Sequence, residues 1–292
     1  ITTRLVGSEM CIRDSSLSVI LMVEKQTEVL MLKELRSRSF TNGKVYALET
    51  EDGYPLEVTD TFLPNYTKDA INNNENTLKT YEVGDRTDRW MIGVSCMSGC
   101  PVHCKFCATG KLKRWRCLTA EEIVAQVEFV IKQNHEYRFE DAWEHKINYT
   151  RMGEPFLNIE EVKKAIQMID EKYPGTHHYI STVGLQGSDF SWIKDNITLQ
   201  VSLHSLDEER RHNLIPISNL MSIEELGQIR TNSNLKTTVN MTLVDYEDFD
   251  INILTKYFDP RYFFIKLSPI NENEISEKNH MGSGIIEKRN LM

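Results

Sequence analysis

The chain has 292 residues, of which 40% are hydrophobic and 26% charged, and its formal net charge is −9. This composition is typical of one large globular domain, or a core with a small appendage, and excludes a disordered, collagenous or coiled-coil chain. No run of about 18 apolar residues occurs, so we expect no membrane association, and an acidic chain does not favour nonspecific binding to nucleic acid. The apolar stretch 17–23 lacks a cleavage site and runs into Glu24 and Lys25, which favours a cytoplasmic protein.

The first 88 residues are predicted to form an accessory region. Residues 1–14 show no periodicity and are interpreted as a non-native segment. Apolar residues at helical spacing predict a helix within residues 16–38. Alternating residues 44–62 around Asp52-Gly53 predict a β-hairpin, and the asparagine-rich stretch 72–76 predicts a loop. We therefore expect a helix and hairpin region at 15–88 and a second unit at 89–292, whose C-terminal end we expect to be truncated.

The second unit is predicted to alternate strands and helices. Six strands are expected at 91–94, 146–150, 178–183, 197–203, 235–244 and 262–267. Helix starts are indicated by Thr119 with Glu122, by Asn158, and by Ser222 with Glu225, and further helices are expected near 190–195 and 249–257. Repeated βα units imply a parallel sheet, so we predict an α/β fold built as a partial (βα)6 barrel. Chemistry in such folds lies at the C-terminal ends of the strands.

Five of the six cysteines fall within one short stretch of this unit. A secreted disulfide-bonded protein usually spreads its cysteines through a smaller chain, so the clustering favours metal binding. Cys100, Cys104 and Cys107 form a C-x3-C-x2-C pattern directly after the strand expected at 91–94. Three thiolates on one loop can hold three irons of a [4Fe–4S] cluster and leave the fourth iron open for chemistry.

A zinc site is the alternative interpretation of these cysteines. Zinc usually takes four ligands, and Cys96, Cys117 or His103 could supply the fourth. Zinc-binding loops favour paired C-x2-C halves, however, and the sequence has one such half. We therefore expect the [4Fe–4S] cluster.

Six short motifs, taken together, resemble one known family. The cysteine pattern after the first barrel strand is similar to that of the radical S-adenosylmethionine (SAM) superfamily. Within it, the chain resembles the RNA adenine methyltransferases, which comprise C2-methylating enzymes of ribosomal and transfer RNA and C8-methylating antibiotic-resistance enzymes. The resemblance covers about residues 44–271 and rests on residues 99–110, Met152-Gly153-Glu154-Pro155, Ser181-Thr182-Val183-Gly184, Val201-Ser202-Leu203-His204, Ile215-Pro216-Ile217 and Ser268-Pro269-Ile270-Asn271.

The resemblance implies two cofactors, a [4Fe–4S] cluster and SAM. The open iron would bind the methionine part of SAM, and a flavodoxin- or ferredoxin-type protein would supply electrons. One SAM would give the methyl group and a second the radical. The positions that match the family's SAM contacts are Gly153, Glu154, Ser181, Ser202, Leu203, His204 and Asn271.

Some of these residues have plainer interpretations when taken alone. Glu154 could be a solvated turn residue, although its carboxylate can accept hydrogen bonds from the ammonium group of SAM. His204 could be a structural hydrogen-bonding residue. Glu57 matches a glutamate that the family uses as a proton acceptor, which makes it the candidate catalytic residue, but it could equally be an ordinary exposed strand residue.

One basic segment directly follows the cysteine pattern. Cations bind phosphate and a tryptophan can stack on a base, so the segment favours contact with single-stranded ribosomal or transfer RNA. A solvated loop that balances an acidic chain is the plainer alternative. The candidate RNA-binding residues are Lys111, Lys113, Arg114, Trp115 and Arg116.

The chain departs from the family at two thiols. The methyltransferases carry a cysteine seven residues before the first cluster cysteine, where this chain has Gly93, and a methyl-carrying cysteine near the C-terminus, whereas no cysteine follows Cys117. Thr150-Arg151 also replaces the small or apolar residues that usually precede the Met-Gly-Glu-Pro motif. Two other functions therefore stay open: a radical SAM enzyme with another substrate, and a noncatalytic RNA-binding or zinc-binding relic.

Overall fold

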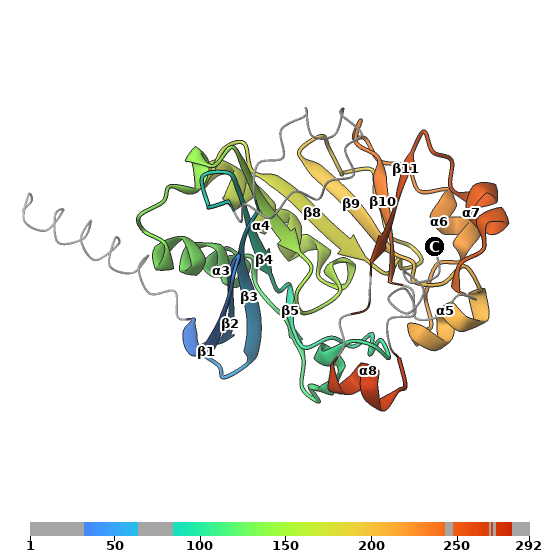
Figure 1. The fold of residues 1–292 in the computed structure, drawn as a ribbon, viewed down its shortest axis with the longest axis horizontal. Helices are drawn as coiled ribbons and strands as arrows, with labels where there is room; N and C mark the ends of the chain where they lie inside the picture. The colour runs from blue at the N-terminus through green and yellow to red at the C-terminus, as the bar shows by residue number, and fades with distance from the viewer. Residues whose placement is uncertain (1–31, 64–83, 243–247, 269, 271–272, 282–292) are drawn as a thin grey trace, which may run out of the picture.

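The computed structural model describes residues 32–63, 84–242, 248–268, 270 and 273–281 (Figure 1). Nine strands form one sheet in the order β1-β2-β3-β4-β7-β8-β9-β10-β11. Their bounds are Lys33–Phe40, Gly43–Glu49, Pro55–Leu63, Arg89–Val94, Glu144–Tyr149, His177–Thr182, Ile197–Ser202, Thr237–Thr242 and Phe263–Ser268. The short strands β5 (Met97–Ser98) and β6 (Arg116–Cys117) pair separately.

The helices follow the strands along the chain. They are α3 (Ala120–Gln133), α4 (Ile159–Lys172), α5 (Glu208–Leu214), α6 (Ile223–Gly227), α7 (Ile251–Tyr257) and α8 (Glu274–Lys278). Three 3-10 turns complete the set: η1 (Ala108–Lys111), η2 (Phe139–Asp141) and η3 (Pro155–Leu157). None of the helices in the described ranges is long and apolar enough to cross a bilayer.

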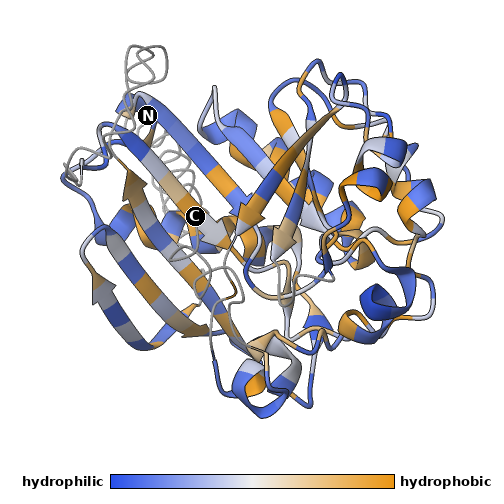
Figure 2. Ribbon diagram, turned by 45° about the vertical axis from the view of Figure 1, so that its right-hand side comes forward, coloured by the Kyte–Doolittle hydropathy of each residue, from blue (hydrophilic) through white to orange (hydrophobic). Residues whose placement is uncertain are grey.

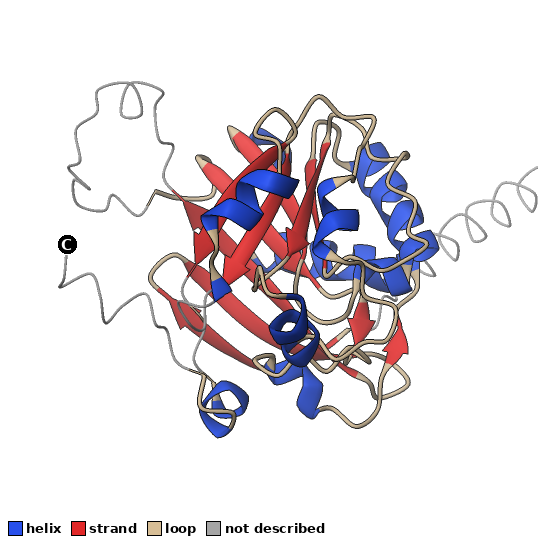
Figure 3. Cartoon of the chain, turned by 90° about the vertical axis from the view of Figure 1, so that its right-hand side faces the viewer, coloured by secondary structure: helices blue, strands red, loops and turns tan. Residues whose placement is uncertain are grey.

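Six strands, β4 and β7 to β11, run parallel, which confirms the predicted partial (βα)6 barrel. Helices lie in each of their connections except the one from β8 to β9. The helices lie along the outside of the strands (Figure 3). Each strand alternates between the two faces, and Figure 2 shows the resulting alternation of hydrophobic and hydrophilic residues. Ile92, Ile147 and Ile180 are fully buried beneath the helices, whereas Asn148 and Tyr179 face the concave side and are partly exposed.

Strands β1 to β3 extend the barrel sheet as an antiparallel meander. The hairpin predicted around Asp52-Gly53 is confirmed as β2 and β3. Strand β3 pairs with β4, where Thr59 lies opposite Gly93, so the accessory strands and the barrel share one sheet. The helix predicted at 16–38 is wrong for its last six residues, 33–38, which lie in β1, because pairing with β2 overrides the helical spacing of the sequence. The rest of that helix, residues 1–14 and the loop at 72–76 lie outside the described residues.

Capping patterns in the sequence predicted where three helices start, but they did not always predict the hydrogen bonds of the capping side chain. Thr119 with Glu122 and Ser222 with Glu225 form capping boxes at α3 and α6, as expected. Asn158 precedes α4, yet its side chain caps nothing and instead donates to the carbonyls of Cys96 and Leu118, both 2.8 Å away. The helix expected at 190–195 is wrong, since that stretch forms turns, and α5 was not expected.

Candidate cofactor site

The cysteine loop, residues 99–107, lies over the C-terminal ends of the parallel strands and is fixed from three sides. Its Val102 packs in an apolar cluster with residues of the β8 end and the α5 end, among them Val183 and Leu214. The Lys105 amide donates to the Leu214 carbonyl at 3.0 Å. Helix α8 lies beside the loop (Figure 1), and its capping residue Asn273 donates to the Phe106 carbonyl at 3.0 Å. The loop is therefore held before any metal binds.

The three thiols of this loop lie close together. The charges of Cys100 and Cys107 act on Cys104, and the Cys107 amide donates to the Cys104 carbonyl at 3.0 Å. Burial raises the pKa of Cys100 to about 11 and raises that of Cys104, so binding of iron must displace their protons. In the part of the chain that the structure describes, no three His, Cys, Asp or Glu side chains converge on the position of a single metal ion.

Glu154 follows β7 and lies near the thiols. Because it is close to them, its charge raises the pKa of both Cys100 and Cys104. It is buried, and its carboxylate accepts hydrogen bonds from the Val183 amide at 2.9 Å and the Phe156 amide at 3.1 Å. Burial raises the pKa of Glu154, while these bonds and one from Thr182 lower it. A carboxylate has roughly four acceptor positions, so three donors leave one for the ammonium group of a ligand. Glu154 is thus not a solvated turn residue.

The hydroxyl groups of Ser181 and Ser202 meet across neighbouring strand ends, 3.3 Å apart. Both side chains are partly exposed on the concave side, where they can reach a ligand. The Leu203 side chain is fully buried in the core, so only its main chain can contact a ligand. Gly153 has a φ of 104°, and a Cβ there would lie 2.6 Å from Met97, so close chain packing by itself requires this glycine. Asn271 lies outside the described residues.

His204 has the strained backbone that often marks a functional position. Its φ of 63° is left-handed, which is uncommon for a residue other than glycine. The Thr242 amide donates to its Nδ1 at 3.1 Å, so Nε2 carries the proton of the neutral ring. Burial, with the nearby charge of Arg211, lowers the pKa of His204 to about 4. Its ring lies edge-to-face with that of Phe106, 4.7 Å between centroids, and so touches the cysteine loop.

A second group of side chains, which we call the mouth corner, consists of Glu57, Thr59, Gly93 and Arg151. Glu57 and Thr59 lie on β3, Gly93 lies opposite Thr59 on β4, and Arg151 follows β7. Arg151 forms an ion pair with Glu57, and its Nε is buried without a hydrogen-bond partner among the described residues. A Cβ on Gly93 would lie 2.4 Å from Thr59 Oγ1 and 3.1 Å from Arg151 Cδ. The arginine stem therefore fills the space beside the glycine.

The basic segment after the cysteine loop is largely engaged with the protein itself. Arg116 pairs with Asp52 at 2.7 Å and Glu122 at 2.6 Å, and the Arg114 guanidinium lies 4.5 Å from the Tyr54 ring centroid. Lys111 pairs with an exposed glutamate of α8. Lys113 and Trp115 are exposed. The segment thus fixes the β2–β3 turn to the barrel, and contact with RNA stays a prediction.

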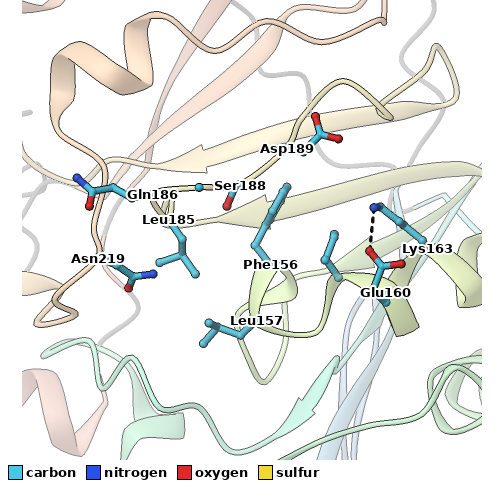
Figure 4. A pocket seen from close by; sticks show the side chains of 11 residues that line it. Phe156, Leu157, Glu160, Lys163, Leu185, Gln186, Ser188, Asp189 and Asn219 are labelled. Atoms are coloured by element: carbon cyan, nitrogen blue, oxygen red, sulfur yellow. Dashed lines mark hydrogen bonds and ion pairs between the residues drawn. The ribbon is translucent and has the colours of Figure 1, made fainter.

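A cavity close to Glu154 in sequence is lined by other residues. A cavity of about 300 Å³ lies between η3, the start of α4 and the loop at 185–189 (Figure 4). Phe156 and Leu185 form its apolar wall, and Lys163 and Glu160 pair at its rim. None of the three cluster thiols lines it.

Two residues of the site were not assigned a function from the sequence. Arg151 appeared only as a departure from the family pattern, and nothing in the sequence links it to Glu57, 94 residues earlier. Asn273 caps α8 and binds the cysteine loop across 167 residues. A polar residue before a short helix signals the cap but not its partner.

Known proteins resemble this chain in sequence and in fold. Residues 94–254 match the model of the radical SAM superfamily. The chain is 34% identical, over 200 residues, to the probable dual-specificity RNA methyltransferase RlmN of Dictyoglomus turgidum, an alignment that covers 66% of this chain and 50% of that protein. It is 32% identical, over 199 residues, to the dual-specificity RNA methyltransferase RlmN of Campylobacter hominis, with coverages of 65% and 51%. The chain spans about half the length of these relatives.

A solved structure supports the fold. The crystal structure of a radical SAM methyltransferase from Sphaerobacter thermophilus superposes with a TM-score of 0.66 at 23% sequence identity. The match covers 93% of this chain and 76% of that one. At this identity the match shows a shared fold.

Proposed function

We propose that this chain, which belongs to the radical SAM superfamily, is an enzyme that uses a [4Fe–4S] cluster and SAM to act on an adenine of RNA. The observation that carries the proposal is the placement of three free thiols beside a buried carboxylate at the mouth of the barrel. The thiols of Cys100, Cys104 and Cys107 are the donors for three irons. The carboxylate of Glu154 is the acceptor for the ammonium group of SAM.

The side chains of this site bind and orient, while the cofactors supply the radical chemistry. When bound, the cluster supplies the electron that cleaves SAM. Glu154 is held against rotation by the amides of Val183 and Phe156, so its free acceptor position stays aimed beside the thiols. Ser181 and Ser202 offer hydroxyl groups, and His204 offers its Nε2 proton, to the polar parts of SAM. Phe106 covers the imidazole ring and keeps water away from it.

The assignment of RNA as substrate depends on the relatives, which are named RNA methyltransferases, and on the six sequence motifs. Glu57 lies on the concave face, where the family's proton acceptor would be needed, but Arg151 neutralises it. For Glu57 to accept a proton from a substrate, this ion pair must open.

The mouth corner favours a second candidate, a radical SAM enzyme with another substrate or outcome. Methyl transfer through a protein thiol needs one thiolate to carry the methyl group and another thiol to release it. The position that the resemblance gives to the releasing thiol is Gly93, which is crowded by Thr59 and Arg151. Cys96, a thiol outside the C-x3-C-x2-C pattern, is buried, and burial raises its pKa strongly.

One experiment tests both candidates. The chain is reconstituted with iron and sulfide without oxygen, reduced, and incubated with SAM and ribosomal or transfer RNA. We expect release of 5′-deoxyadenosine, measured by chromatography, and no methyladenosine in digested RNA by mass spectrometry. Cys104→Ala is the control that should release none. If the protein loaded with its cluster releases no 5′-deoxyadenosine, the chain is not a radical SAM enzyme. Formation of 2-methyladenosine over many turnovers would show that a residue outside the two family thiol positions carries the methyl group.

A further inference from the structure

Strand β1 presents two arginines that have no acidic partner among the described residues. Arg36 and Arg38 lie in a strand that is exposed along its whole length. No carboxylate of the described ranges forms an ion pair with either of them, and the Arg38 guanidinium lies 5.1 Å from the Phe40 ring centroid. The chain has a formal net charge of −9, so exposed guanidinium groups without an acidic partner need an explanation.

The strand register places both arginines on the concave face of the sheet. In the strand register Arg36 lies opposite Ala47, and Ala47 lies opposite Glu57. These three residues therefore form one row across β1, β2 and β3 that includes Glu57 of the mouth corner. In the next row Arg38 pairs with Val45, and Val45 pairs with Thr59. Neighbouring strands are about 4.8 Å apart, so each arginine lies roughly 10 Å from the mouth corner across small side chains.

The acidic groups near these rows are either neutralised or on the other face. Glu57 is paired with Arg151, and Glu49 is paired with Lys33. Glu34 pairs across the strands with buried Leu48 and therefore belongs to the convex face. The concave face of β1 to β3 keeps a net positive charge as a result. Its floor of alanine and valine side chains leaves both guanidinium groups accessible.

We propose that the concave face of β1 to β3, with Arg36 and Arg38 as its phosphate-binding groups, is the surface on which the backbone of single-stranded RNA enters the barrel. This proposal rests on the proposed function and gives its substrate a path. Arginine binds phosphate through several donors in a planar fork. A strand lying on this face meets Thr59 and Gly93 next, and then the concave residues of β7 and β8, Asn148 and Tyr179. The basic segment at 111–116 is less suited, because Arg116 already has two carboxylate partners.

Salt dependence of RNA binding tests this surface directly. The affinity of the reconstituted chain for a fluorescein-labelled oligoadenylate is measured by anisotropy over a series of salt concentrations. Each phosphate contact contributes roughly 0.7 to the slope of log K against log salt for a single strand, so the double substitution Arg36→Gln with Arg38→Gln should lower the slope by about 1.4. Arg36→Lys with Arg38→Lys keeps the charge and should keep most of the slope.

The matched control removes two charges elsewhere. Arg138 and Arg261 are exposed, pair with neighbouring aspartates, and precede β7 and β11, at the ends of the strands remote from the mouth. Arg138→Gln with Arg261→Gln should leave the slope unchanged. Equal slopes for the native chain and the β1 double variant would overturn this surface while leaving RNA as the substrate. No salt-dependent binding by the native chain would overturn both. Circular dichroism and iron content verify that the variants fold.

Discussion

The cysteine loop and the mouth corner lie at the same edge of the sheet but are built in opposite ways. The loop takes its three thiols from eight consecutive residues, Cys100 to Cys107. The mouth corner takes its four members from β3, β4 and the segment after β7, so Glu57 meets Arg151 across 94 residues. The loop lies within the residues that match the superfamily, whereas Gly93, where the resemblance predicts a thiol, lies outside them and packs against Thr59 and the Arg151 stem.

The proposed reaction has two halves, the binding of the cluster and SAM and the transfer of the methyl group, and these two regions serve one half each. In the proposed reaction, binding of the cluster and SAM depends on the cysteine loop and on Glu154, which lie in short sequence motifs. In the same proposal, transfer of a methyl group depends on the mouth corner, where the packing around Gly93 decides whether a thiol fits. A chain can therefore keep the first half while changing the second. The predictions below test that separation, beginning with the largest effect.

The largest effect is expected at the loop itself. Replacing Cys100, Cys104 or Cys107 with Ala should abolish the cluster, since three thiolates are the minimum donor set for a cluster with one open iron. Reconstitution followed by iron and sulfide analysis measures this, with about four of each expected in the native chain. Cys96→Ala and Cys117→Ala are the matched controls and should retain the cluster. Loss of the cluster in Cys117→Ala with retention in Cys107→Ala would show that Cys117, and not Cys107, is a cluster ligand.

Acidification should weaken the packing between His204 and the loop. The folded pKa of about 4 lies below the usual 6.5, so the unfolded chain binds the proton first as pH falls. Stability from this residue is complete above pH 6.5 and is lost between pH 6.5 and 4, by up to about 3 kcal/mol. Urea unfolding of the cluster-free protein at several pH values measures the loss.

His204→Gln supplies the control for that titration. The variant keeps a hydrogen-bonding side chain but cannot titrate, so its free energy of unfolding should fall less between pH 6.5 and 4. His177, whose pKa burial also lowers, contributes equally to both proteins and cancels in the difference. Identical pH profiles for the two proteins would show that the imidazole is not held neutral in the folded state.

The parts that the sequence predicted correctly are those that local rules determine. Capping boxes located α3 and α6, hydrophobic runs located the six parallel strands, and spacing located the thiols. The parts that it missed depend on partners far along the chain. Asn158 stands at the position of a helix cap, but its side chain donates to two loop carbonyls. Arg116 lies in a basic segment that predicts RNA binding, but it forms ion pairs with Asp52 and Glu122. A side chain's partner cannot be read from its own neighbourhood in the sequence.

A smaller effect is expected on SAM binding. Glu154→Gln keeps the shape of the side chain but removes its charge, so the hydrogen bond to the ammonium group weakens. The expected loss is roughly 1.5–3 kcal/mol, or about 10- to 150-fold in affinity by calorimetry. Glu160→Gln at the rim of the neighbouring cavity is the control and should bind SAM normally. Unchanged affinity in Glu154→Gln would place this carboxylate outside the SAM site.

The smallest effect is expected at the mouth corner, from Gly93→Ala. The new Cβ would lie 2.4 Å from Thr59 Oγ1, so Thr59 must rotate and Arg151 must shift. The Arg151 stem is flexible, whereas the β-branched Thr59 must change its rotamer, and the expected loss of stability is about 1 kcal/mol. In a Thr59→Ala background the first clash disappears. Gly93→Ala should then be neutral or slightly stabilising, because alanine lowers the entropy of the unfolded chain.

A double-mutant cycle measured by urea unfolding decides whether Thr59 is the obstacle. Thr61→Ala is the matched control, since Thr61 lies on the same face of β3 but pairs with Met91. It should leave the cost of Gly93→Ala unchanged. An equal cost in the native, Thr59→Ala and Thr61→Ala backgrounds would place the obstacle at the Arg151 stem instead. If Thr59→Ala alone removes the cost, Gly93→Cys in that background would place a thiol at the corner, and the separation between the two halves of the reaction would depend on one hydroxyl group.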